Sequence, residues 1–259
     1  MKNLRFICAQ PATNYYAWQV EVMLNNFIAM GINPNNIDIV CCKRGNNVPD
    51  NWSKLALKYP ARFLFYNDTR VDRNYISSIR PNILKQHFLK FPELKDEVIF
   101  YHDCDIMFTK PVTSWITKEM IEDTNWYGSN TISYIGHDYI ISKGEDVLDK
   151  MCSLVGIDKS VIKDNEYNSI GAQYLLKGIT SEFWSKVEID SERLFTEITT
   201  LNKVKKANDS GYHELQIWCA DMWAVLWNGW KKDITTVTHS NFNFSWGTST
   251  LKTYNRCNK

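Results

Sequence analysis

The sequence predicts an α/β fold in which a mostly parallel central sheet is flanked by helices, and two observations lead to this class. Short runs of apolar, β-forming residues alternate with longer segments of helical periodicity through the first half of the chain. A hydrophobic share of 44% beside 23% charged residues is typical of a globular chain, and 259 residues suffice for one large domain. We therefore expect a single domain over residues 1–259, with a first half of about 1–108 and a second half of about 109–259.

The first half has an order of elements that predicts parallel strand pairing. Pro11 stops the first strand, and Gly31 closes the first helix. Pro81 must lie near the first turn of its helix or kink it, because proline has no N–H to donate. The expected order is strand, helix, strand, strand, helix and strand, over residues 4–10, 15–30, 37–42, 61–66, 74–92 and 97–108. Strands that are separated by helices in this way pair in parallel.

The second half is less regular. We expect a strand over residues 125–135, a helix over 144–157 and a strongly aromatic helix over 212–230, and we find no repeat or low-complexity segment. The most apolar window is too short to cross a bilayer and contains Asp221, so no membrane span is expected.

Cysteine usage and charge bear on location and partners. Seven cysteines form no C-x-x-C pair, and several lie in apolar runs, which indicates buried free thiols in a reducing compartment. Met1 leads almost directly into the first strand without a signal peptide, so a cytoplasmic protein is expected. A net charge of +1 gives no whole-chain argument for a polyanionic partner, and no protein partner is predicted.

The segment "VIFYHDCDIMF" places two carboxylates, Asp103 and Asp105, at the end of an apolar run. A carboxylate needs a partner there, because desolvating its charge costs several kcal/mol. Side chains two residues apart in extended chain point the same way, so both can face one ion, and hard oxygen ligands favour Mg²⁺ or Mn²⁺. The alternative is a pair of solvated aspartates at the end of a strand.

This arrangement resembles the DXD motif of GT-A glycosyltransferases, which have a Rossmann-like sheet and use a nucleotide-diphosphate sugar with a divalent metal. The resemblance implies that Asp103 contacts the ribose, or the metal through water, and that Asp105 ligates the metal. Cys104 between them would then belong to the nucleotide-sugar site. The order of elements extends the resemblance over most of the chain, with a nucleotide-sugar half followed by an acceptor half.

Other donor-site residues follow from the same resemblance. The loop "AQPATNYY" stands where that family binds base and ribose, so Gln10, Pro11 and Tyr15 are candidate donor contacts. Gln10 can pair with a base edge and Tyr15 or Tyr16 can stack on it, unless the loop tyrosines merely pack on the neighbouring helix. On the helix before the DXD strand, Arg80 and Lys85 are candidates for phosphate or sugar contacts, the alternative being solvated side chains.

Three further groups complete the expected site. His239, in "THSNFNFSW", is the candidate third metal ligand, or else an exposed loop histidine. Asp221 is a lone acid among tryptophans and aliphatics, and it is the candidate general base if it is not a buried structural aspartate. The family often has a second acid before this base, where this chain has Ala220. The candidate acceptor-binding residues are Gly171, Ala172 and Trp246.

The resemblance implies transfer of a sugar, with UDP-sugar the favoured donor, to an acceptor hydroxyl with inversion. The Asn- and Lys-rich texture is similar to that of small glycosyltransferases of large DNA viruses and phages, whose acceptors include glycans and hydroxymethylated DNA bases; a viral protein would act in the host cytoplasm. Two rivals stay open. One is a non-catalytic sugar- or nucleic-acid-binding module, favoured by the many aromatic residues. The other is a haloacid-dehalogenase-type phosphotransferase, although its motif belongs on the first strand.

Overall fold

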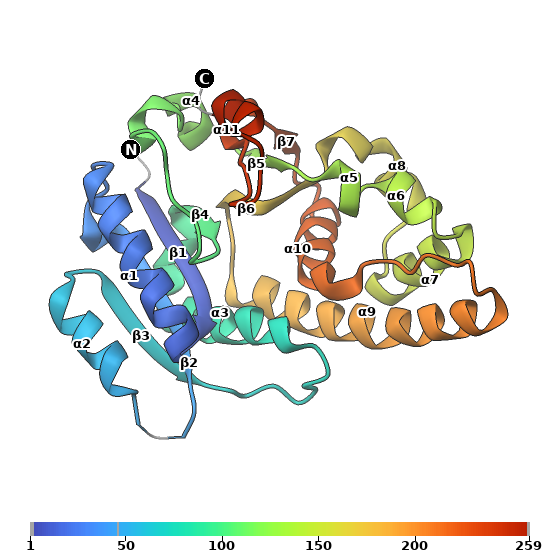
Figure 1. Cartoon of the computed structure of the whole chain (residues 1–259), viewed down its shortest axis with the longest axis horizontal. Coiled ribbons are helices and arrows are strands. Elements are labelled where there is room, and N and C mark those ends of the chain that lie inside the picture. Colours follow the sequence, from blue (N-terminus) through green and yellow to red (C-terminus); the bar gives the residue numbers. More distant parts are fainter. Residues whose placement is uncertain (1–2, 46, 258–259) are drawn as a thin grey trace.

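The computed structural model describes residues 3–45 and 47–257, and within them seven strands form one sheet (Figure 1). The strands are β1 (Leu4–Pro11), β2 (Ile37–Lys43), β3 (Arg62–Asn67), β4 (Val98–His102), β5 (Trp126–Asn130), β6 (Ile170–Lys177) and β7 (Thr236–Thr238). Their order is β3-β2-β1-β4-β6-β5-β7, and only β6 runs antiparallel to its neighbours β4 and β5. The predicted α/β class with a mostly parallel central sheet is confirmed.

Helices cover both faces of this sheet (Figure 1). They are α1 (Asn14–Ala29), α2 (Asp50–Lys58), α3 (Ile79–Lys90), α4 (Lys118–Glu122), α5 (Ile132–Ile135), α6 (His137–Ile141), α7 (Glu145–Val155), α8 (Lys159–Asp164), α9 (Ser181–Asn208), α10 (Ala220–Trp230) and α11 (Leu251–Cys257). Side chains alternate along β1, so that Phe6 and Cys8 join the apolar cluster under α1 and α2, whereas Ile7 and Ala9 join the cluster with α3, α7, α9 and α10. The sheet is therefore buried on both faces.

The structure corrects several predicted boundaries. The strand expected over 125–135 ends at Asn130, and the helix expected over 212–230 begins at Ala220 after a short 3₁₀ turn. Pro81 is the third residue of α3, where its missing N–H is harmless, as expected. Met1, on which the expectation about a signal peptide depends, lies outside the described residues.

The state of the cysteines and the character of the helices can be compared with the expectations from the sequence. All seven cysteines are free; Cys257 is half-buried and the other six are buried, which confirms the expectation for those six. Within the described ranges, none of the helices combines the length and the apolar character that crossing a bilayer requires.

A buried charge cluster ties β2 to its neighbours. Asp38 is fully buried, and its carboxylate pairs with Arg5 at 3.2 Å and also with Arg62. His87 Nε2 lies 3.0 Å from Asp38 Oδ2, while its Nδ1 lies 3.1 Å from the Tyr66 hydroxyl. A neutral imidazole that donates from Nε2 and accepts at Nδ1 satisfies both contacts. Burial lowers the pKa of His87, although Asp38 opposes this shift.

We expect the free energy of unfolding to fall as the pH drops below about 6.5, the ordinary pKa of histidine. Because the folded-state pKa of His87 is lowered, the unfolded chain takes up a proton first. Each such histidine therefore costs about 1.4 kcal/mol of stability per pH unit until its folded-state pKa is reached. Burial also lowers the pKa of His102 to about 4. Urea unfolding from pH 7.5 to 5 should show a smaller slope in His87→Gln, and an unchanged slope in the exposed control His213→Gln.

Candidate active site

The candidate site lies where the order of strands reverses along the sheet. From β1 the chain continues to β2 and β3 on one side, whereas β4 lies on the other side of β1 and parallel to it. In open α/β sheets, ligands bind outside the carboxyl ends of the strands at such a reversal. Pro11 ends β1 and Asp103 directly follows β4, so both lie at this edge.

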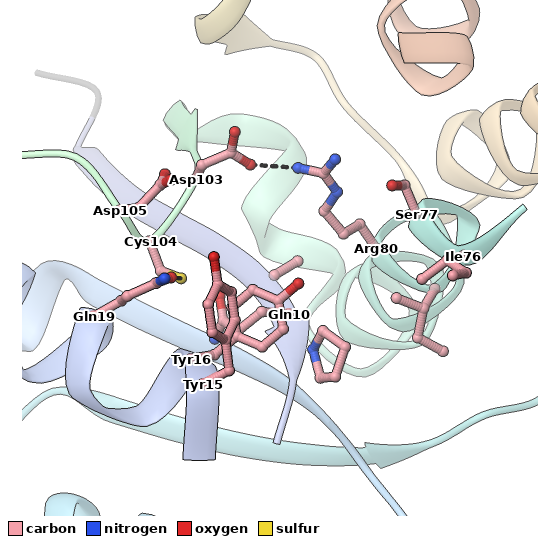
Figure 2. Close-up of a pocket in the computed structure, with 13 residues that line it drawn as sticks. Gln10, Tyr15, Tyr16, Gln19, Ile76, Ser77, Arg80, Asp103, Cys104 and Asp105 are labelled. Carbon is pink, nitrogen blue, oxygen red and sulfur yellow. Dashed lines mark hydrogen bonds and ion pairs between the residues drawn. The ribbon is translucent and has the colours of Figure 1, made fainter. Parts of the chain in front are cut away.

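A pocket of about 190 Å³ opens at this edge of the sheet (Figure 2). Its walls come from β1, α1, the 3₁₀ turn η2 (Ile76–Ser78), α3 and the turn after β4. The lining residues are Ala9, Gln10, Pro11, Tyr15, Tyr16, Gln19, Ile76, Ser77, Ile79, Arg80, Asp103, Cys104 and Asp105. The carboxylates of Asp103 and Asp105 thus share one pocket with two tyrosine rings, an amide and a guanidinium.

The pocket brings together most of the residues predicted for the donor and metal site. They are Gln10, Pro11, Tyr15, Arg80, Asp103, Cys104 and Asp105. Tyr16, the alternative stacking residue, also lines the pocket, and Gln19 and Ser77 join them without having been selected from the sequence. Lys85 is not among the lining residues; it faces α9, where its Nζ pairs with Glu188 at 2.6 Å. Lys85 and His239 are therefore the predicted donor and metal residues that do not line the pocket, while what each residue binds stays a prediction.

Arg80 links the carboxylate pair to the candidate base. Its Nη1 donates to Asp103, as Figure 2 shows, and its Nη2 lies 3.1 Å from Asp221 Oδ2. The Asp221 side chain is only 10% exposed, that of Arg80 is 26% exposed and that of Asp103 is 48% exposed. Asp221 is the second residue of α10, near the helix start as expected. One guanidinium therefore connects the pocket to a more deeply buried carboxylate.

The charges of this trio act on one another. Enclosure by the pocket walls raises the pKa of Asp103 even though almost half of its side chain is exposed, and Arg80 opposes this shift. The neighbouring carboxylates of Asp105 and Asp221 raise the pKa of Asp103 further. Burial acts to lower the pKa of Arg80, but Asp221 and Asp103 hold it well above the ordinary value. The pocket therefore carries excess negative charge around a permanently charged guanidinium, which favours a bound cation.

Tyr75, which the sequence analysis did not select, holds the other oxygen of Asp221. The Tyr75 hydroxyl lies 2.6 Å from Asp221 Oδ1 and 2.6 Å from the carbonyl oxygen of Trp218. Its ring is buried and stacks on Phe195 of α9 at a centroid distance of 4.8 Å. Burial and the neighbouring Asp221 raise the pKa of Tyr75, so its hydroxyl remains a donor. Tyr75 and Arg80 together fix both oxygens of Asp221.

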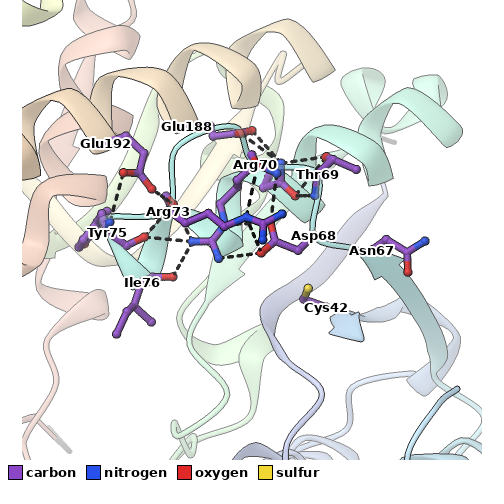
Figure 3. Close-up of polar contacts among 12 residues, drawn as sticks. Cys42, Asn67, Asp68, Thr69, Arg70, Arg73, Tyr75, Ile76, Glu188 and Glu192 are labelled. Atoms are coloured by element: carbon purple, nitrogen blue, oxygen red, sulfur yellow. Dashed lines mark hydrogen bonds and ion pairs between the residues drawn. The ribbon is translucent and has the colours of Figure 1, made fainter. Parts of the chain in front are cut away.

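A polar network positions the segment that carries Tyr75 and η2 (Figure 3). Arg70 pairs with Asp68 through Nε at 3.0 Å and Nη2 at 2.9 Å, and its Nη1 donates to the carbonyl oxygen of Tyr75 at 3.1 Å. Glu192 of α9 accepts from the Tyr75 amide at 3.1 Å and from the Ser78 hydroxyl at 2.5 Å. Glu192 lies more than a hundred residues from its partners Tyr75 and Ser78, so no local pattern in the sequence reveals this network.

Gln10 lines the pocket, and its buried side chain carries an unpaired acceptor. Only 2% of the residue is exposed, its Nε2 lies 3.3 Å from Cys41 Sγ, and its Oε1 has no hydrogen-bond partner. A buried amide oxygen without a partner costs about 1–3 kcal/mol, so a ligand that donates to it is favoured. A nucleobase N–H in the pocket would meet this requirement.

The predicted set of three metal ligands is not assembled. Within residues 3–45 and 47–257, no three His, Cys, Asp or Glu side chains gather closely enough to hold a metal ion. His239 instead caps the 3₁₀ turn η7 (Ser240–Phe242), where its Nδ1 accepts from the Asn241 amide at 3.1 Å. His239 adopts this position because the residue that caps a helical turn supplies a side-chain acceptor to a free backbone N–H. Asp103 and Asp105 remain the carboxylates of the pocket.

The predicted acceptor residues lie outside the pocket lining. Packing within the fold, and not a ligand, explains glycine at position 171. A Cβ there would lie 2.4 Å from Met222 Cε and 2.8 Å from Thr131 Oγ1. Ala172 has a left-handed φ of 62° beside the register shift between β5 and β6, which indicates a bulge. Trp246 is 62% exposed and packs edge-on against Phe244.

Comparisons with known proteins give structural likenesses only. No protein-family model and no curated protein matches the sequence. Among solved structures, the apo bifunctional glycosyltransferase WbbM is similar with a TM-score of 0.48 and 9% identity over 99% of this chain. The chain spans 44% of that protein's length. The mannosyltransferase PcManGT from Pyrobaculum calidifontis, in complex with GDP-Man and Mn²⁺, is similar with a TM-score of 0.34 and 12% identity over 87% of this chain and 71% of the other. At these scores, the likenesses do not indicate what this chain binds or transfers.

Proposed function

We propose that the chain is a glycosyltransferase that moves a sugar from a nucleotide-diphosphate sugar to an acceptor hydroxyl. The observation that carries the proposal is the position of Asp103 and Asp105, which directly follow β4 and share a pocket at the strand-order reversal with Tyr15, Tyr16 and Arg80. Rings, a cation and paired carboxylates are the groups that a base, a diphosphate and a divalent ion require.

The chemistry of the pocket walls supports a nucleotide-sugar donor. The ring of Tyr15, which is 63% exposed, offers a face for the base, and the free Oε1 of Gln10 offers an acceptor for a base N–H. Arg80 offers a guanidinium to phosphate oxygens. Uridine diphosphate sugar is the donor that we favour. The inferred location in a cytoplasm, that of a host if the protein is viral, rests on composition alone.

The carboxylates Asp103 and Asp105 fit a Mg²⁺ or Mn²⁺ ion. Both line the pocket, both supply hard oxygens, and the excess negative charge around Arg80 favours a cation. A bound ion would supply charge stabilisation to the departing nucleoside diphosphate. Two protein carboxylates leave coordination positions for diphosphate oxygens and water, which is usual for these ions.

Transfer with inversion gives Asp221 the role of general base. The acceptor oxygen forms a bond to the anomeric carbon while the bond from that carbon to the phosphate oxygen breaks, and the nucleoside diphosphate leaves with the electron pair. The acceptor proton passes to a carboxylate oxygen of Asp221. Tyr75 and Arg80 hold this carboxylate in place, and each oxygen retains a second lone pair for the proton.

Thermal unfolding with each nucleoside diphosphate, with and without Mn²⁺, tests the donor site. A ligand present at 100 times its dissociation constant stabilises the fold by about 2.7 kcal/mol, which raises the midpoint by several degrees. We expect one nucleotide to raise the midpoint, and Mn²⁺ to increase that shift. If no nucleotide changes the midpoint at millimolar concentration, and no nucleotide sugar is hydrolysed, the glycosyltransferase proposal is wrong.

A further inference from the structure

Three tryptophans among the described residues are more than half exposed: Trp18, Trp218 and Trp246. An exposed indole costs solvation free energy, so its position is informative when it adjoins a site. Trp218 lies on the 3₁₀ turn η6 (Ile217–Cys219), immediately before α10, and is 56% exposed. Its backbone carbonyl and the carboxylate of the candidate base, Asp221, contact the same Tyr75 hydroxyl.

That tie is short. The Tyr75 hydroxyl lies 2.6 Å from the Trp218 carbonyl oxygen and 2.6 Å from Asp221 Oδ1. Because one hydroxyl touches both groups, the turn that carries the indole is adjacent to the buried carboxylate. Through Arg80, the same carboxylate is joined to Asp103 at the donor pocket. The turn that carries the indole therefore lies at the Asp221 end of the Asp103–Arg80–Asp221 chain.

The indole is held in a fixed orientation. Its ring stacks on Tyr134 of α5 with a centroid distance of 6.4 Å and an interplanar angle of 16°. The turn is anchored on its other side as well, because the Gln216 amide donates to the Tyr139 hydroxyl at 3.1 Å and Cys219 is buried. An aromatic surface that is both exposed and rigid loses little entropy when a ligand stacks on it.

An unsatisfied hydroxyl lies in the same region. Tyr174 of β6 is 2% exposed, and its hydroxyl has no hydrogen-bond partner. Its ring stacks on Tyr101, its register partner on β4. Burial raises the pKa of Tyr174, and Asp221 and Tyr134 raise it further, which places this hydroxyl in their electrostatic field. Buried hydroxyls without partners are rare in folded proteins.

We propose that Trp218, backed by Tyr134, is the platform on which the acceptor stacks, and that this acceptor is a pyranose of a glycan. The C–H face of a pyranose packs on an indole, while its hydroxyls require the polar groups that surround this one. The inference rests on the proposed sugar transfer, for which Trp218 would place an acceptor hydroxyl at Asp221. A DNA acceptor is disfavoured, because phosphates need cations and the nearby charges are three carboxylates beside an Arg80 that is already paired.

Saturation-transfer NMR with methyl pyranosides of glucose, galactose, mannose and N-acetylglucosamine tests the platform directly, with and without nucleoside diphosphate and Mn²⁺. We expect the C–H protons of at least one pyranoside to receive saturation from the wild-type protein. In Trp218→Ala the apparent Kd for that sugar should rise at least about tenfold, the loss expected for one aromatic stack. Trp218→Phe should recover most of the affinity. The matched control, Trp18→Ala, removes an equally exposed tryptophan from α1 and should change nothing.

The outcomes separate this inference from the proposed function. Trp218 is exposed, so its variants should unfold at the wild-type midpoint and keep the nucleotide-dependent shift, which reports the donor site alone. A wild-type protein that hydrolyses nucleotide sugar but binds no pyranoside through Trp218 retains the proposed function and overturns the platform. Trp218-dependent binding of an oligonucleotide containing hydroxymethylated bases, without any pyranoside binding, would also overturn the glycan assignment. If a pyranoside binds through Trp218 but no nucleotide or nucleotide sugar binds, the platform is supported and the proposed sugar transfer is wrong.

Discussion

Asp105→Asn is expected to lower nucleotide-sugar turnover about a hundredfold or more, and to abolish the part of the nucleotide-induced thermal shift that depends on Mn²⁺. The substitution keeps the shape of the side chain but removes the charge that a divalent cation requires. Because Asp105 is exposed in the pocket, the unliganded protein should unfold within about 0.5 kcal/mol of wild type.

Asp164→Asn is the matched control, since Asp164 is an exposed aspartate at the end of α8 and lies outside the pocket. Turnover assays and thermal unfolding of wild type and both variants, at several Mn²⁺ concentrations, make the comparison. Undiminished, Mn²⁺-stimulated turnover in Asp105→Asn would show that the carboxylate pair does not hold the ion.

Arg80→Met is expected to cost about 3 kcal/mol of unfolding free energy and most of the activity. Removing the guanidinium leaves Asp221 buried without its ion partner, and breaking a buried pair typically costs about 3–5 kcal/mol. The low end of that range applies because 26% of the Arg80 side chain is exposed. Urea unfolding of the variant measures the loss.

The double variant Arg80→Met with Asp221→Asn separates stability from catalysis. Neutralising the stranded carboxylate should return about half or more of the lost stability, because the largest part of the cost is an uncompensated charge. Activity should not return, since the candidate base is then absent. A double variant as unstable as Arg80→Met would mean that Arg80 stabilises the fold through packing or through Asp103 rather than through Asp221.

The first half of the fold was predictable because local signals agreed there. The alternating runs form β1 to β4 as expected, although the strand expected over 97–108 ends at His102, and Pro81 lies in the first turn of its helix. Both carboxylates of "VIFYHDCDIMF" lie in the pocket for the reason inferred from their position at a strand end. Only the short helix Asp50–Lys58 was missed in this half.

The long helix α9 was not predicted, because the buried face of this helix carries acidic residues. Glu188, Asp190 and Glu192 interrupt what would otherwise be an apolar stripe. Each has a partner from another segment: Glu188 pairs with Lys85, Asp190 binds Asn228, and Glu192 binds Tyr75 and Ser78. Such partners lie 38 to 117 residues away, so no local pattern reveals them.

In the candidate site too, some residues could be selected from local sequence patterns and others could not. Asp103 and Asp105 could be selected because they follow a recognisable strand, and Gln10 and Tyr15 because the segment around the end of the first strand resembles a known nucleotide-binding loop. Tyr75 could not, because its role depends on a contact with Asp221 across 146 residues. His239 was predicted as a metal ligand. Its Nδ1 instead caps the turn Ser240–Phe242 by accepting from the Asn241 amide.

The origin of the pocket walls has a consequence for how such a protein diversifies. Every residue that lines the donor pocket precedes residue 106, whereas the indole platform and the candidate base follow residue 216. Recombination or loop exchange in the later part of the gene could therefore change the molecule that receives the sugar without rebuilding the nucleotide pocket. Arg80 and Tyr75 are the two side chains that reach across this boundary to Asp221. An exchanged segment would need to retain a carboxylate within their reach, and Glu192 of α9, which binds Tyr75 and Ser78, would have to stay in place.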